Sequence, residues 1–112
     1  MRKSNEKVRL PPLRSLQVFE VAARHESFTR AAQEIGVTQG AVSHQVRELE
    51  DVLQIRLFRR DKQRLELTEK GRQLGEAAGR ALGILEGAIL TLKARPAQPP
   101  EAVTLSMLPS LA

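Results

Sequence analysis

Four side chains that can form hydrogen bonds with the edge of a base pair or with a phosphate recur along one short segment. They are Gln39, Ser43, His44 and Arg47. An amide, a hydroxyl, an imidazole and a guanidinium offer the donors and acceptors that read bases in the major groove of DNA. Apolar residues share the segment at the i, i+4, i+7, i+11 spacing of a buried helical stripe: Val42, Val46, Leu49 and Leu53. The segment from Gln39 is therefore predicted to be a helix with one buried face and one base-reading face.

A shorter helix and a tight turn are predicted to position this helix. Residues 29–35 show a helical pattern of about two turns. Gly36 follows, where helices commonly end in the left-handed conformation that glycine adopts at low cost, and Thr38 occupies the position of an N-cap. Two helices joined in this way form a helix-turn-helix, here over residues 28–47, whose second helix enters a DNA major groove. The same pattern also fits an αα-hairpin in a small helical bundle.

The charge of the chain supports a nucleic-acid partner. Its 18 Lys and Arg outnumber its 13 Asp and Glu, which gives a formal net charge of +5. The segment from Arg56 to Arg64 holds five cations and one anion. A solvated loop would explain such a run alone, but beside a helix-turn-helix it is the expected signature of a phosphate-binding surface. Three Phe and no Tyr or Trp leave no stacking platform for single strands, which favours duplex DNA.

The candidate DNA contacts fall into two groups. The expected base contacts are Gln39, Gly40, Ser43 and His44. The expected backbone contacts lie near helix N-termini and in the basic segment, where phosphate oxygens find their usual partners. They are Thr29, Arg30, Thr38, Arg47, Arg59, Arg60, Lys62 and Arg64.

The remaining patterns define the fold around these residues. Residues 1–10 form a basic arm, and residues 11–68 are predicted to be a winged helix-turn-helix whose first helix ends near His25. Two short strands at 57–59 and 65–67, joined by a polar loop, would form the wing. The predicted fold class is mainly α, with three helices and a two-stranded wing followed by a long helix.

Thr68 is predicted to cap that long helix, which spans residues 69–93. Its apolar stripe is too long for the preceding domain to cover, and the simplest partner is the same helix of a second subunit. The predicted dimer interface is Leu74, Ala78, Ala81, Leu82, Leu85, Ile89 and Leu92.

Glycines recur every fourth residue along the same helix, at 71, 75, 79, 83 and 87. Two interpretations stand: incidental replacement of alanine on a surface face, or a deliberately soft connecting helix. Residues 94–102 are predicted to be a Pro-rich linker, and residues 103–112 alternate like the first strand of a truncated second domain.

Several functional classes are disfavoured. The absence of Cys removes disulfides and thiolate metal sites and suits a reducing cytoplasm, and no apolar run approaches the ~20 residues of a membrane span. His25 and His44 fall on different predicted helices, with no catalytic grouping, phosphate-cradling loop or metal-ligand spacing around them. We expect a non-enzyme without a cofactor or metal of its own, located in the cytoplasm with the nucleoid.

The order of these elements resembles the N-terminal half of a LysR-type transcriptional regulator over about Leu10 to Lys93. The motifs that carry the resemblance are Phe19, Ala22-Ala23, Ser27 to Ala32, Val37-Thr38-Gln39, Ala41-Val42-Ser43, Gln45-Val46, Leu49-Glu50, Leu57 to Arg60 and Leu67 to Gly71. Within the family the chain looks most like the regulators of the glycine-cleavage operon. Many members have proline where Gly40 stands and arginine where His44 stands, so the resemblance does not carry guanine readout to His44.

The resemblance implies a sequence-specific transcription factor that binds an inverted-repeat operator in double-stranded DNA as a homodimer, possibly a tetramer when full length. It also implies a small-molecule effector bound in a following domain, RNA polymerase as a partner, and no membrane association. The alternative is a helical dimerisation or interaction module whose basic wing binds an acidic protein without reading DNA sequence.

Overall fold

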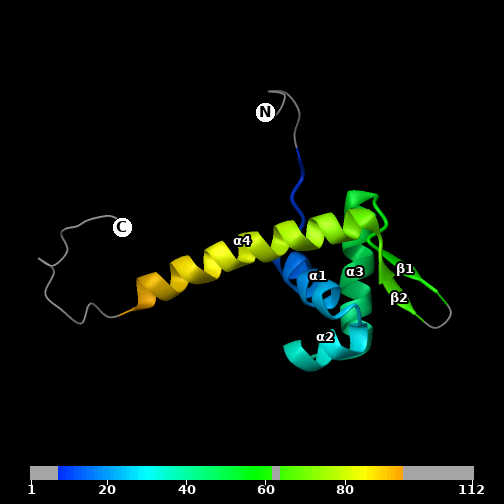
Figure 1. The fold of residues 1–112 in the computed structure, drawn as a ribbon, viewed down its shortest axis with the longest axis horizontal. Coiled ribbons are helices and arrows are strands. Elements are labelled where there is room, and N and C mark those ends of the chain that lie inside the picture. Colours follow the sequence, from blue (N-terminus) through cyan, green and yellow to red (C-terminus); the bar gives the residue numbers. More distant parts are fainter. Residues whose placement is uncertain (1–7, 62–63, 95–112) are drawn as a thin grey trace, which may run out of the picture. The chain divides into compact units, whose positions relative to one another are not determined.

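The computed structural model describes residues 8–61 and 64–94. Along the chain it contains α1 (Leu13–His25), α2 (Phe28–Ile35), α3 (Gln39–Leu53), β1 (Phe58–Arg60), β2 (Leu65–Leu67) and α4 (Glu69–Lys93) (Figure 1). This order confirms the predicted mainly helical, winged helix-turn-helix architecture. The predictions for arm residues 1–7, Lys62, linker residues 95–102 and the strand at 103–112 lie outside the described residues. The chain divides into two compact units, 1–82 and 83–112.

Three phenylalanines form the centre of the core. Phe58 packs edge to face against Phe19 and Phe28, with ring centroids 5.8 and 5.3 Å apart. All three side chains are buried. Because each ring belongs to a different element, this cluster joins α1, α2 and the wing.

The turn between α2 and α3 has the predicted chemistry. Gly36 adopts φ +87°, and its N–H donates to the carbonyl of Ala32 at 2.8 Å. The hydroxyl of Thr38 accepts from the N–H of Ala41 at 3.1 Å and caps α3. The cap of α2, which the sequence reasoning missed, is Ser27, whose hydroxyl accepts from Arg30 N–H at 3.0 Å. The start of α3 is therefore set by local hydrogen bonds.

The wing is an antiparallel hairpin in which Phe58 pairs with Leu67 and Arg60 with Leu65. The first strand begins one residue later than predicted, at Phe58 rather than Leu57. Leu57, just before the strand, donates its N–H to the carboxylate of Glu50 at 2.8 Å and accepts from Thr68 N–H at 3.0 Å.

The glycines that recur along α4 have different surroundings and do not share one structural role. A Cβ at Gly71 would lie 2.1 Å from the carbonyl oxygen of Leu57, and one at Gly75 would lie 3.2 Å from Cβ of Ala23. Around Gly83 and Gly87 there is open space. Close packing thus requires glycine at position 71, because a side chain there would clash with the backbone of Leu57. Neither incidental replacement of alanine nor a soft helix explains this glycine.

Candidate nucleic-acid interface

A polar hollow of about 450 Å³ lies between the start of α2, one side of α3 and the wing. It brings together six of the predicted site residues: Thr29, Gln39, Ser43, Arg47, Arg60 and Arg64. Its guanidinium groups come from three separate segments, namely α3, β1 and the residue before β2. Such a surface can hold phosphate oxygens beside groups that reach base edges.

The burial of α3 fixes which of its side chains face this hollow. Val42, Val46 and Leu49 are buried against the core. Gln39, Ser43 and Arg47, spaced four residues apart, form a row that lines the hollow. We call this the inner row.

Two more predicted base contacts lie outside the hollow. Gly40 and His44 belong to the neighbouring row of α3, and both are exposed. Nε2 of His44 lies 3.1 Å from the carboxylate of Glu48. We call Gly40, His44 and Glu48 the outer row.

Arg60 is held by the fold as well as facing the hollow. One of its guanidinium nitrogens lies 3.4 Å from Glu50, and its Cζ lies 5.7 Å from the centroid of the Phe28 ring. Its side chain is 27% exposed. Arg60 therefore combines packing with its predicted place at the wing.

Glu50 connects α3 to the wing and was missed by the sequence reasoning. Its carboxylate accepts from the backbone N–H groups of Leu57 at 2.8 Å and Phe58 at 3.1 Å, besides its ion pair with Arg60. Only 10% of its side chain is exposed. The available signal was an acidic residue directly beside the buried stripe, followed by a basic strand that could supply its partner.

The other predicted backbone contacts are more exposed. Arg59 points to the opposite face of the hairpin from Arg60 and lies 3.5 Å from Glu66. Thr38 uses its hydroxyl as the cap of α3, while Thr29 and Arg30 are exposed in the first turn of α2. Of these four residues Thr29 lines the hollow, and Arg30, Thr38 and Arg59 do not.

Two polar links hold the helix-turn-helix against α1. Arg24 bonds to Glu20 and to Glu34, and Nε2 of His25 lies 2.8 Å from Glu34. The guanidinium of Arg24, and then His25, lower the pKa of the Glu34 carboxyl below its ordinary value, while the two carboxylates raise the pKa of Arg24. Both shifts favour the charged pairs that hold α2 to α1.

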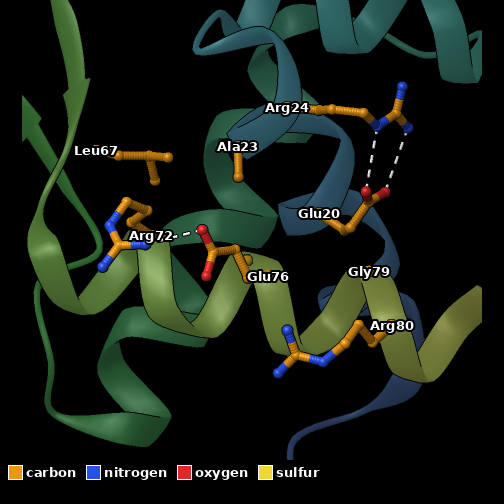
Figure 2. Close-up of a pocket in the computed structure, with 9 residues that line it drawn as sticks. Glu20, Ala23, Arg24, Leu67, Arg72, Glu76, Gly79 and Arg80 are labelled. Atoms are coloured by element: carbon orange, nitrogen blue, oxygen red, sulfur yellow. Dashed lines mark hydrogen bonds and ion pairs between the residues drawn. The ribbon is translucent and has the colours of Figure 1, made fainter.

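A larger cavity, of about 550 Å³, lies between α1, the end of the wing and the first half of α4 (Figure 2). It shares no lining residue with the polar hollow. Most of its charges are already paired: Arg24 with Glu20, and Arg72 with Glu76. None of the predicted DNA contacts lines it.

Within residues 8–61 and 64–94, no group of carboxylates and imidazoles could hold a metal, and no helix is long and apolar enough to cross a membrane.

The fold and the hollow agree with a family match. Residues 13–72 match the family described as bacterial regulatory helix-turn-helix protein, lysR family. The chain belongs to this family, and the predicted resemblance is confirmed.

Individual relatives point the same way. The chain is 51% identical over 104 residues to the glycine cleavage system transcriptional activator of Escherichia coli K12, covering 93% of this chain and 33% of that protein. It is 52% identical over 91 residues to the homologue of that activator in Haemophilus influenzae, covering 79% of this chain and 30% of that protein. The chain thus spans about a third of the length of these relatives, which are transcriptional regulators.

A solved structure extends the comparison to three dimensions. The DNA-binding domain of BenM in complex with catB site 1 DNA matches with a TM-score of 0.69 and 28% identity. The match covers 74% of this chain and 92% of that one. Full-length CbnR complexed with its target DNA matches with a TM-score of 0.66 and 27% identity, over 75% of this chain and 29% of that one.

Proposed function

We propose that the chain is the DNA-reading part of a transcriptional regulator that recognises a specific sequence in double-stranded DNA. The observation that carries the proposal is the polar hollow, where the inner row of α3 meets arginines of the wing. A helix that enters the major groove needs base-reading groups flanked by cations that hold the adjacent phosphates, and the hollow supplies both. The DNA in the BenM and CbnR complexes supports this proposal.

The proposed roles are those that the types and spacing of the residues predict, and the polar hollow supports six of them. Gln39 and Ser43 of the inner row, together with Gly40 and His44 of the outer row, would meet base edges. Thr29, Arg30, Thr38 and Arg47 would hold phosphates near the starts of α2 and α3. The wing would contact the backbone or the adjacent minor groove through Arg59, Arg60, Lys62 and Arg64.

We also propose that two chains pair through α4. Leu85 and Ile89 are 46% and 49% exposed, and Leu92 is 82% exposed. Of the predicted interface, Ala78 is buried within its own unit and Leu74 packs against the same core, so they are already covered. The proposal therefore rests on Ala81, Leu82, Leu85, Ile89 and Leu92, and a two-fold dimer implies an inverted-repeat site.

For the whole protein we propose a non-enzymatic regulator of the cytoplasm and nucleoid that responds to a small-molecule effector and acts on RNA polymerase. The identity with a glycine cleavage system activator supports a regulatory role of that kind. Assembly beyond the dimer belongs to the same proposal.

The decisive experiment selects binding sites from a pool of duplexes with a randomised core. The proposal expects a defined site whose complex survives an excess of random competitor DNA. Equal competition by every duplex would instead favour the interaction module, in which a basic wing binds acidic partners without reading sequence.

Arg64→Ala sharpens the test of the wing, because Arg64 lines the hollow. The variant should weaken binding to all duplexes and flatten the slope of log K against log salt by roughly one unit for a lost phosphate contact. Arg80→Ala is the matched control, since it removes the same charge from α4 outside the hollow. Equal slopes in the two variants would remove Arg64 from the interface.

A further inference from the structure

Arg60 differs from the other arginines of the polar hollow because the fold already holds its side chain. One guanidinium nitrogen lies 3.4 Å from Oε1 of Glu50, and Cζ lies 5.7 Å from the centroid of the Phe28 ring. Its backbone belongs to β1. Arg47 and Arg64, which line the same hollow, are exposed. Arg60 therefore has a fixed position before any DNA arrives.

Glu50 uses its two carboxylate oxygens for different contacts. Oε2 accepts from the backbone N–H groups of Leu57 and Phe58 at 2.8 and 3.1 Å, where the chain enters β1. Oε1 accepts from Arg60, two residues further along the wing. Because Glu50 lies on α3, one carboxylate sets the position of Arg60 relative to the inner row on the same helix.

The position of Arg60 depends on this carboxylate. Nε of Arg60 is buried and has no hydrogen-bond partner in the part of the chain that the structure describes. A buried donor without an acceptor is costly. Glu50 and Phe28 therefore hold the guanidinium in place against this cost. Without the charge of Glu50, the side chain of Arg60 would turn toward solvent and any phosphate within reach.

We propose that Glu50 is a positioning residue that makes Arg60 selective for the correct DNA site. A cation held in one place gains most from a phosphate that arrives at that place, and a complex in register with the groove brings one there. In a random complex Arg60 must give up Glu50 to reach a phosphate. Glu50 thus lowers the affinity for random DNA more than the affinity for the selected site. The inference rests on the proposed function, because it requires α3 and the wing to lie on DNA.

Arg60→Met, made in the full chain, tests whether the held arginine is selective, because it removes the charge and keeps an unbranched stem. On the selected site, affinity should fall about tenfold and the slope of log K against log salt should flatten by roughly one unit. On random duplex both should change little. Arg64→Ala is the comparison, since an exposed arginine of the hollow should lose affinity for both duplexes alike. Equal losses on both duplexes in Arg60→Met would overturn the inference.

Glu50→Gln tests the carboxylate itself, because the amide oxygen can still accept from the N–H groups at the start of the wing. Urea denaturation establishes that the variant is folded. We expect its affinity for random duplex to rise about fivefold and its affinity for the selected site to change little, so that the ratio of the two falls. Asp51→Asn is the matched control, since it neutralises an exposed carboxylate one residue away and outside the hollow.

A double-mutant cycle separates the effect through Arg60 from plain repulsion of phosphates by a carboxylate. In an Arg60→Met background, Glu50→Gln should change affinity no more than Asp51→Asn does. A gain that persists in this background overturns the inference, as do equal effects of Glu50→Gln and Asp51→Asn in the parent chain. If Glu50→Gln does not fold, the comparison of Arg60→Met with Arg64→Ala decides alone. These outcomes leave a selected site intact, whereas a wild type that selects no site overturns the proposed function as well.

Discussion

At the scale of single residues, the chemistry of α3 is divided between its two exposed rows. The inner row of Gln39, Ser43 and Arg47 faces cations of the wing, while the outer row faces away from the hollow. The helical period and the buried Val42, Val46 and Leu49 were sufficient to predict which side of α3 is exposed, while contact with DNA stays a prediction. The ion pair between Glu50 and Arg60 could not be predicted, because the two residues are 10 apart in the sequence and meet only in the folded chain.

Gln39→Ala tests direct reading of a base. If the amide of Gln39 contacts a base edge, the variant should lose about 1–3 kcal/mol on the selected site and much less on random duplex. Fluorescence anisotropy titrations on both duplexes would measure the two losses. Gln17→Ala is the control, because Gln17 is an exposed amide on α1 outside the hollow. Equal losses on both duplexes would place Gln39 among the phosphate contacts.

Glu50→Ala tests the connection between α3 and the wing. The variant leaves the N–H groups of Leu57 and Phe58 without their acceptor in a nearly buried place. The free energy of unfolding should fall by about 3 kcal/mol, which urea denaturation would measure. Glu66→Ala, which removes an exposed pair with Arg59, should change it by less than about 1 kcal/mol. A loss at Glu50 no larger than that at Glu66 would contradict the structural role.

At the scale of elements, local signals account for what could be predicted. The α2–α3 turn followed from Gly36 and Thr38, because a left-handed glycine and an N-cap act within a few residues of themselves. The wing was predicted with its first strand displaced by one residue, since the bounds of β1 depend on pairing with β2 across the loop and not on neighbouring residues alone. The role of Gly71 escaped prediction for the same reason: the atom that excludes a side chain there belongs to Leu57.

Replacing different glycines of α4 by alanine should therefore change the free energy of unfolding in opposite directions. Gly71→Ala would force a Cβ against the carbonyl of Leu57 and should destabilise the fold by about 1–3 kcal/mol. Gly83→Ala and Gly87→Ala meet no neighbour and should each stabilise the helix by about 1 kcal/mol. Thermal unfolding of the three variants would test this. A stabilised Gly71→Ala chain would show that α4 does not approach Leu57 so closely.

At the scale of the whole molecule, the exposed apolar part of α4 is the feature that a single chain does not explain. Ile84 and Leu90, which were not predicted at the interface, are 72% and 69% exposed. Large apolar side chains gathered on one segment are typical of a surface that a partner covers. The apolar pattern predicted that a partner is needed but could not predict which turns are covered within the chain, because that depends on the packing of α1.

Leu85→Asp tests the proposed pairing. An unpaired carboxylate in the apolar interface is costly to bury, so sedimentation velocity should show a monomer that binds the full inverted repeat much more weakly. Thr91→Asp adds the same charge at another exposed position of α4 and should remain dimeric. A dimeric Leu85→Asp chain would place the interface elsewhere.

The exposed residues of α4 have a consequence for gene dosage. If a regulator must pair before it occupies its operator, occupancy at low abundance rises with the square of the number of chains in the cell rather than in proportion to it. Halving the supply of such a protein then lowers promoter occupancy to about a quarter. A modest change in synthesis or degradation becomes a steep change in transcription, and the steepness arises from a few uncovered leucine and isoleucine side chains on one helix.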